Sequence, residues 1–273
     1  MRRFAESSNM KIAIAGKGGV GKTTLAALLA RVFARGGRSV VAVDADPDGN
    51  LASALGVPPE AAPEPIAGMR ELVRERTGAR DEGWGLMFKL NPKVDDLPGR
   101  FTLNADGVRL LVLGTVEAGG KGCMCPEGAV LKALMQHLLL RIEDDVVLDM
   151  EAGLEHMGRA SAAGVDAMIV VVEPGLRSVK TAARVRALAS DIGVERVFVV
   201  LNRVSGESER DALMALVERE LKGVVVLGVL PLSKALARAD LEGRSVDVDD
   251  AVFNGAVAGV EAALRKELGG APA

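Results

Sequence analysis

Two groups of residues in this chain have types and spacings that could do chemistry. The first is a glycine-rich stretch that ends in a lysine and a threonine, Gly16-Lys17-Gly18-Gly19-Val20-Gly21-Lys22-Thr23. The second is a pair of cysteines one residue apart, Cys123 and Cys125. Backbone N–H groups in a glycine-rich turn converge on phosphate oxygens, and thiolates bind soft metal ions. Together the two groups predict a protein that couples ATP to the handling of a metal ion.

The glycine-rich stretch matches the phosphate-binding loop at every fixed position. It lies between a predicted strand, residues 11–15, and a predicted helix, residues 22–35, which is the context that such a loop requires. In this arrangement Lys22 bridges the β- and γ-phosphates of ATP, and the hydroxyl of Thr23 holds Mg²⁺. The residues expected to contact the nucleotide here are Gly18, Gly19, Val20, Gly21, Lys22, Thr23 and Thr24.

Carboxylates follow two predicted strands that neighbour the loop. Asp44, Asp46 and Asp48 come after residues 39–43, and Asp149 follows the apolar run 146–148. At the carboxyl ends of parallel strands these side chains can reach Mg²⁺ or the attacking water. We expect Asp149 to contact the Mg²⁺ shell, in a Walker B arrangement, and Asp44 to assist there. A helix cap or a turn is the alternative role for Asp44.

Strand-like and helix-like segments alternate along the chain, which predicts an α/β fold with a mostly parallel sheet flanked by helices on both faces. We expect one P-loop NTPase domain over residues 10–268, a disordered N-terminal tail at 1–9, and a C-terminal tail at 269–273. The segment 58–100 is rich in proline, glycine and charge, and is predicted to be an irregular insertion with one short helix at 71–77. The other predicted strands are 109–113, 167–172, 196–201 and 224–229, and the other helices are 126–141, 178–190, 207–221 and 252–268.

The composition argues against several classes of protein. A net charge of −3 gives no basic excess for general nucleic-acid binding. No stretch approaches the roughly 20 apolar residues of a membrane span. The two cysteines are too close together to form a long-range disulfide framework, so a reducing, cytoplasmic location is expected. Residues 1–9 lack the apolar region of a signal peptide.

Two thiolates in a Cys-X-Cys pair cannot complete a four-coordinate zinc or nickel site alone. A two-fold homodimer would supply the missing pair from the same residues of the second chain. Pro126 is expected to begin a helix, whose positive end lowers the pKa of a thiol. An inert buried pair and a strained redox disulfide are the alternatives to a metal site.

The second lysine, Lys17, gives the loop its deviant form, Gly-Lys-Gly-Gly-Val-Gly-Lys-Thr-Thr. This form resembles that of the dimeric ATPases that include the nitrogenase iron protein and the septum-positioning and partition ATPases. The resemblance implies that Lys17 reaches across a dimer to the partner's ATP, and that Asp46 positions the attacking water. It further implies that Asn202 contacts adenine and that Pro231 and Leu232 close on the base.

The resemblance narrows around the cysteines. Residues 114–117, 119–127 and 149–159 look like those of the CooC-type ATPases of carbon monoxide dehydrogenase maturation. This implies an ATP-dependent nickel metallochaperone that binds Ni²⁺, or Zn²⁺, between two subunits through Cys123 and Cys125. The implied client is carbon monoxide dehydrogenase or acetyl-CoA synthase.

Two other functions compete with this one. An electron-transfer ATPase like the nitrogenase iron protein has widely separated cysteines, one of them three residues after the Walker B aspartate, where this chain has Ala152. A positioning or partition ATPase that binds a membrane needs a basic amphipathic C-terminal helix. Here the last helix balances two basic residues against two acidic ones. His137 and His156 are not counted as metal ligands, although a switch role remains open for His156.

Overall fold

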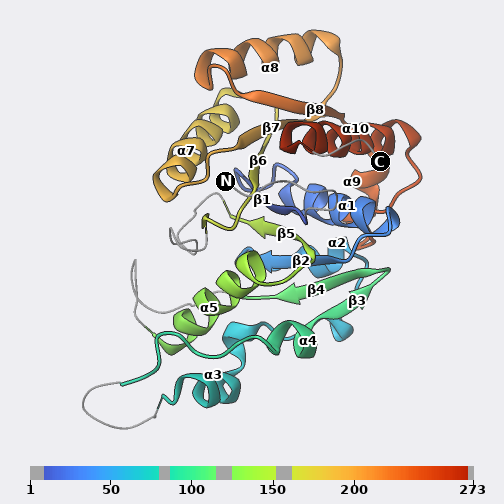
Figure 1. The fold of residues 1–273 in the computed structure, drawn as a ribbon. Coiled ribbons are helices and arrows are strands. Elements are labelled where there is room, and N and C mark those ends of the chain that lie inside the picture. Colours follow the sequence, from blue (N-terminus) through green and yellow to red (C-terminus); the bar gives the residue numbers. More distant parts are fainter. Residues whose placement is uncertain (1–8, 80–86, 115–124, 152–161, 270–273) are drawn as a thin grey trace.

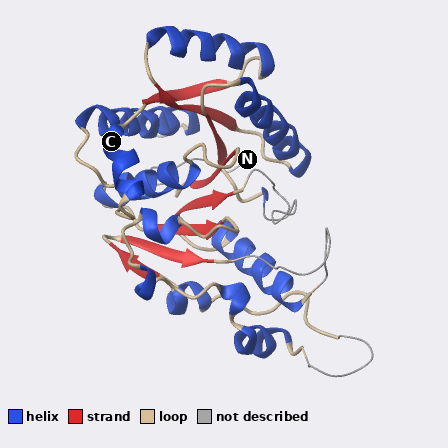
Figure 2. Ribbon diagram, turned by 180° about the vertical axis from the view of Figure 1, so that it is seen from behind, coloured by secondary structure: helices blue, strands red, loops and turns tan. Residues whose placement is uncertain are grey.

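The computed structural model describes residues 9–79, 87–114, 125–151 and 162–269. These residues form an eight-stranded sheet in the order β3-β4-β2-β5-β1-β6-β7-β8, with helices on both faces (Figures 1 and 2). All neighbouring strands are parallel except β3 and β4, which are antiparallel. The predicted α/β class with a mostly parallel sheet is therefore confirmed.

The central strands are apolar runs that are buried on both faces, as parallel strands between two helical layers must be. Every residue of β1, β2, β5 and β6 is buried. The strands are β1 (Lys11–Gly16), β2 (Val40–Ala45), β3 (Leu103–Ala105), β4 (Val108–Val112), β5 (Asp145–Met150), β6 (Ala167–Val172), β7 (Val197–Val204) and β8 (Val225–Pro231).

Helices cover both faces and enclose two hydrophobic cores. Along β1, Ala13 and Ala15 belong to one core, and Ile12 and Ile14 belong to the other. The helices are α1 (Lys22–Arg35), α2 (Leu51–Ala54), α3 (Arg70–Thr77), α4 (Leu97–Phe101), α5 (Pro126–Leu140), α7 (Leu176–Ile192), α8 (Glu207–Glu220), α9 (Lys234–Leu241) and α10 (Ala251–Leu268). Side chains of α1, α2 and α10 fill the second core, and those of α5, α7 and α8 fill the first.

Some elements differ from the prediction. Strand β2 continues through Asp44 and Ala45, whereas the prediction ended it at residue 43. An aspartate interrupts the apolar run, but its backbone still pairs with both neighbouring strands. Three short elements, β3, α2 and α9, were not predicted, because runs of three to eight residues give a periodic pattern little room to appear.

The predicted insertion, residues 58–100, is more regular than expected in its described part. Besides α3 it contains two 3₁₀ helices, η1 (Pro59–Ala61) and η2 (Ile66–Gly68), and most of α4. Its apolar side chains share a core with α5, so tertiary packing holds these short elements in place. The fully buried members are Ile66 and Leu97.

The insertion also contacts the end of β4. The N–H of Ala67 donates to the carbonyl oxygen of Leu113 at 3.0 Å. The next residue, Gly114, has a left-handed φ of +73°, and a Cβ there would lie only 2.7 Å from the Cβ of Pro65. Close packing against the insertion therefore requires glycine at the point where β4 leads into the cysteine segment.

None of the helices in the described residues is long and apolar enough to cross a membrane. The predicted tails at 1–9 and 269–273 lie almost entirely outside the described residues, as does the tryptophan of the insertion, Trp84.

Candidate nucleotide site

The glycine-rich loop connects β1 to α1 at the carboxyl edge of the sheet. In parallel α/β sheets ligands bind outside the carboxyl ends of the strands. A cavity of about 380 Å³ lies there, a size that suits a small-molecule or cofactor site. Predicted nucleotide-site residues that line it are Gly18, Gly19, Gly21, Lys22, Thr23, Thr24, Asp46, Asn202, Pro231 and Leu232. The structure brings these residues together, while their contacts with a nucleotide remain predictions.

Gly21 ends the loop and caps α1 in a conformation that only glycine adopts easily. Its φ is +95°, and a Cβ at this position would lie 2.4 Å from the side-chain nitrogen of Asn202. That nitrogen donates to the carbonyl oxygen of Val20 at 2.8 Å. Asn202 is buried at the end of β7, so its hydrogen bond holds the loop against the wall of the cavity where β7 and β8 end.

The lysine of α1 faces a carboxylate. The Nζ of Lys22 lies 3.4 Å from Oδ2 of Asp46, and both side chains are buried. The other oxygen of Asp46, Oδ1, accepts a hydrogen bond from the N–H of Asp48 at 3.1 Å. Asp46 is thus fixed at the cavity, next to the residue that is predicted to contact the γ-phosphate.

Asp44 and Asp149 lie side by side, because their Cα atoms are partners in the β2–β5 ladder. Asp44 accepts hydrogen bonds from the N–H groups of Leu51, at 3.0 Å, and Asp46, at 3.3 Å. It therefore caps the start of α2, which was the alternative role. Burial raises the pKa of Asp44 to about 6.

Neither carboxylate oxygen of Asp149 has a hydrogen-bond partner, although both are buried. Burial raises the pKa of Asp149 to about 7, and the nearby Thr23 and Lys22 offset this only in part. An unpartnered buried carboxylate beside a threonine hydroxyl is suited to a divalent cation. Mg²⁺ typically takes one or two carboxylates and completes its shell with water and phosphate oxygens. The described residues include no cluster of three or more His, Cys, Asp or Glu that could hold a metal by themselves.

Two charged residues beside the phosphate loop were not predicted. Glu173, directly after β6, accepts hydrogen bonds from Lys17 and from Arg203. Arg203 lines the cavity and has a left-handed φ of 59°, at a register shift between β7 and β8. A carboxylate at a strand end is too common in sequences to single out Glu173. The only sequence feature that could have marked Arg203 as a site residue is its position directly after Asn202, the predicted adenine contact.

The far wall of the cavity is built from α9, α10 and the segment between them. Its lining residues there are Ser233, Leu236, Ala237, Asp240, Gly243, Arg244, Val246 and Phe253. The hydroxyl of Ser233 donates to Oδ2 of Asp250 at 2.6 Å, and each of these residues caps its own helix. Because these contacts come from residues far from the loop in the sequence, no motif marked this wall.

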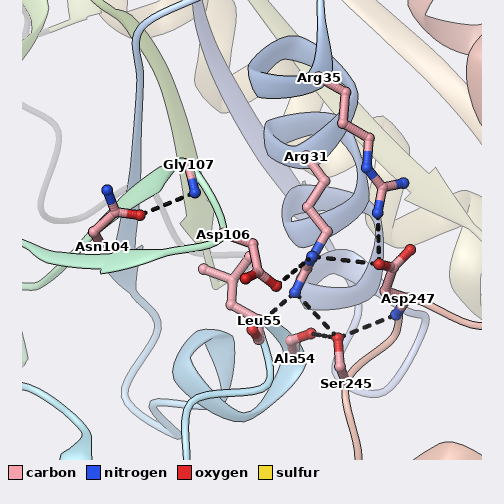
Figure 3. A network of polar contacts seen from close by, with 9 residues as sticks. All are labelled: Arg31, Arg35, Ala54, Leu55, Asn104, Asp106, Gly107, Ser245 and Asp247. Atoms are coloured by element: carbon pink, nitrogen blue, oxygen red, sulfur yellow. Dashed lines mark hydrogen bonds and ion pairs between the residues drawn. The ribbon is translucent and has the colours of Figure 1, made fainter.

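Arg31 of α1 contacts the segment between α9 and α10 that forms part of this wall (Figure 3). Its buried guanidinium donates to the carbonyl oxygen of Leu55, at 2.9 Å, and to the hydroxyl of Ser245, at 3.3 Å. It also pairs with Asp106 and Asp247, at 3.1 and 3.4 Å. The end of α2, the β3–β4 turn and the segment after α9 therefore meet at one side chain.

Cys125 precedes α5, and its Sγ accepts a hydrogen bond from the N–H of Gly128 at 3.3 Å. A thiolate in this position is stabilised by the helix N-terminus. Since α5 returns the chain to the start of β5, its first turn lies toward the same edge of the sheet as the phosphate loop. Cys123 and His156 lie outside the described residues. His137 is part of α5 and is half-buried.

Comparisons with known proteins agree with this geometry. The family described as "CobQ/CobB/MinD/ParA nucleotide binding domain" matches residues 11–246. The carbon monoxide dehydrogenase accessory protein CooC of Rhodospirillum rubrum is 44% identical over 86% of this chain and 89% of its own. An uncharacterized ATP-binding protein of Methanocaldococcus jannaschii is 42% identical over 88% of this chain and 92% of its own.

A solved structure has the same fold. The septum site-determining protein MinD of Pyrococcus horikoshii, in complex with Mg-ADP, superposes with a TM-score of 0.62. The match covers 96% of this chain and 98% of that one, at 18% sequence identity. At this identity the likeness establishes the fold alone.

Proposed function

The chain belongs to the CobQ/CobB/MinD/ParA family of P-loop nucleotide-binding ATPases, and on that basis we propose that it uses ATP hydrolysis to insert nickel into an enzyme. The client would be carbon monoxide dehydrogenase or acetyl-CoA synthase. The relative that is named a carbon monoxide dehydrogenase accessory protein supports the first of these. The observation that carries the proposal is the Cys125 thiol directly before α5, toward the edge of the sheet that holds the phosphate loop.

The proposed hydrolysis uses groups that already face one another. Lys22 stabilises charge on the transferred phosphoryl group, and Asp46 orients the attacking water. The water oxygen bonds to the γ-phosphorus as the bond to the β–γ bridging oxygen breaks, which gives ADP and phosphate. Thr23 and Asp149, with Asp44 beside them, would hold Mg²⁺, which neutralises charge on the phosphate oxygens.

Metal binding requires a second subunit in this proposal. Each chain supplies two thiolates, from Cys123 and Cys125, and two chains supply the four ligands of a nickel or zinc site. Lys17 of each subunit would contact the nucleotide of the other, so nucleotide binding and metal binding favour the same homodimer. Hydrolysis would loosen the dimer and release the metal to the client.

The first test measures metal content and mass in solution under anaerobic conditions with Ni²⁺. The expected result is one nickel per dimer for the wild type and none for a Cys123→Ser/Cys125→Ser variant. A His137→Ala variant is the control, because it removes a histidine of α5 that is not counted as a metal ligand, and it should retain nickel. Cysteine-independent nickel, or none at all, would refute the metallochaperone.

The second test asks whether hydrolysis is coupled to delivery. An Asp46→Asn variant should bind nickel but fail to activate nickel-free carbon monoxide dehydrogenase or acetyl-CoA synthase. Activation of only one of the two enzymes by the wild type identifies the client. Normal activation by the variant would show that hydrolysis is not required.

A further inference from the structure

Glu173 forms ion pairs with Lys17 of the phosphate loop and with Arg203, which lines the nucleotide cavity at the end of β7. Its Oε1 lies 3.0 Å from Nζ of Lys17, and its Oε2 lies 3.3 Å from a terminal nitrogen of Arg203. We call these three residues the Glu173 bridge. Both cations are about half exposed, while the carboxylate between them is only 23% exposed.

The sheet brings the three residues of the bridge together. Lys17, Glu173 and Arg203 lie at the carboxyl ends of β1, β6 and β7, three adjacent parallel strands. Gly16 pairs with Val171, so Lys17 and Glu173 follow the ends of two paired strands. Val172 pairs with Leu201, and Arg203 lies two residues beyond Leu201, near the end of β7. The three residues of the bridge therefore come from neighbouring strand ends, and Arg203 reaches Glu173 from a position with a left-handed φ of 59°.

The backbone of Glu173 is anchored as well. Its N–H donates to the hydroxyl of Ser178 at 3.1 Å, and Ser178 is buried in the first turn of α7. This hydrogen bond fixes the backbone position of Glu173, so its carboxylate is a well-placed ion-pair partner for Lys17 on the same subunit.

Both loop lysines are thus paired with carboxylates of their own chain. Lys22 faces Asp46 inside the cavity, where a phosphate bound in the same subunit would replace the carboxylate. Lys17 points to Glu173 instead. If Lys17 acts on a nucleotide held by another subunit, it must first leave Glu173, and the free energy of that ion pair is subtracted from the free energy of association.

We infer that Glu173 is a positioning residue that holds Lys17 on its own subunit and so weakens nucleotide-dependent dimerisation until a partner's phosphates compete for the lysine. Arg203 remains on the other carboxylate oxygen, so Glu173 keeps a cationic partner after Lys17 leaves. This inference rests on the proposed function, because it needs Lys17 to act in trans.

The test compares dimer dissociation constants by sedimentation, at saturating Mg²⁺ and a non-hydrolysable ATP analogue. Glu173→Gln should lower the dissociation constant about two- to fivefold, the range that a solvent-screened ion pair supports. Glu220→Gln removes the same charge and a surface ion pair with Arg219 on α8, and should leave the constant unchanged. Lys17→Gln should itself weaken the dimer, and in that background Glu173→Gln should not change the remaining dissociation constant, which a purely structural role would not predict.

A second readout needs no dimer. Reductive methylation with ¹³C-formaldehyde of the nucleotide-free protein should modify Lys17 faster in Glu173→Gln than in the wild type, at equal melting temperature. Equal rates would overturn the claim that Glu173 holds Lys17.

The outcomes separate the two proposals. If the wild type dimerises with the analogue but Glu173→Gln dimerises equally or more weakly, the role of Glu173 is overturned and the proposed function stands. If the wild type stays monomeric, the proposed function fails, and the inference that depends on it is overturned too.

Discussion

The side-chain amide of Asn202 donates a hydrogen bond of 2.8 Å to the carbonyl oxygen of Val20, a residue 182 positions earlier in the chain. The contact links the end of β7 to the phosphate loop. It uses one amide hydrogen of Asn202 and leaves the carbonyl oxygen of the same side chain available to the cavity, which Asn202 lines.

Replacing Asn202 with alanine should weaken nucleotide binding. The carbonyl oxygen of Val20 would lose its partner, and an unsatisfied buried acceptor costs about 1–3 kcal/mol. We expect ADP affinity, measured by calorimetry, to fall about tenfold or more. Asn254→Ala removes an exposed amide that donates to Val248, and should leave affinity unchanged. Unchanged affinity in Asn202→Ala would show that the contact does not position the loop.

Gly21→Ala should destabilise the protein even without nucleotide. The new Cβ would meet the side chain of Asn202 at 2.4 Å, and the left-handed backbone disfavours alanine by about 1–2 kcal/mol. Urea unfolding should show a loss of roughly 2 kcal/mol or more. Gly18→Ala is the matched control, because nothing lies within 4 Å of a Cβ there, and it should change stability by less than about 0.5 kcal/mol.

Asp149→Asn should have opposite effects on stability and on ligand response. The neutral amide removes a buried carboxylate without hydrogen bonds, so the metal-free protein should gain about 1 kcal/mol. The rise in melting temperature caused by Mg²⁺ and ATP should shrink, because that rise depends on ligand affinity. Asp48→Asn, an exposed change at the same cavity, should alter neither quantity. An undiminished response to Mg²⁺ in Asp149→Asn would remove Asp149 from the metal site.

Arg31→Met should destabilise far more than Arg35→Met, although both arginines pair with Asp247. The guanidinium of Arg31 is buried and holds three segments together, whereas the side chain of Arg35 is 62% exposed. We expect urea unfolding to show losses of about 2 kcal/mol and under about 0.5 kcal/mol. Equal losses would mean that Arg31 does not hold the cavity wall.

The buried Lys11, at the amino edge of the sheet, predicts that folding stability depends on pH. Burial lowers its pKa to about 8, although Asp144, Asp145 and Asp166 around it act in the opposite direction. The unfolded chain keeps this proton up to its ordinary pKa near 10.5, so it binds more protons than the folded chain between pH 8 and 10.5. Folding stability from this group must therefore rise with pH across that window.

The check is urea unfolding at pH 7.5 and 9.5, for the wild type and Lys11→Met, both in a Cys123→Ser/Cys125→Ser background so that no thiol titrates. The rise in stability with pH should be smaller in the methionine variant. Arg38, which pairs with Asp145, stays charged throughout this range. Identical slopes in the two proteins would show that Lys11 does not lose its proton in this window.

The sequence predicted fewer than half of the residues that line the cavity, but it was sufficient to predict the sheet class, the phosphate loop and the carboxylates beside it. These follow from local patterns: a glycine-rich turn between a strand and a helix, and carboxylates after apolar runs. The prediction placed α1 at its observed bounds, residues 22–35, because its start is fixed by the loop and its end by two glycines.

The rest depends on tertiary contacts that leave no local pattern. Glu173 and Arg203 meet because they lie at the ends of the adjacent strands β6 and β7, and Arg31 joins segments that are up to 216 residues apart. The role of Asp44 could not be predicted from the sequence either, because its sequence context suits both a metal ligand and a helix cap. The structure shows the cap, while a contact of Asp44 with Mg²⁺ remains a prediction.

The contact between Ala67 and Leu113 has a consequence for anyone who shortens this protein. Residues 58–100 look like a removable insertion, yet their described part fills part of the core that α5 covers and contacts Leu113, directly after β4. Deleting them would expose apolar side chains of α5, the helix that directly follows Cys125. A minimal version of the protein must therefore keep this segment, or redesign the helix surface that it covers.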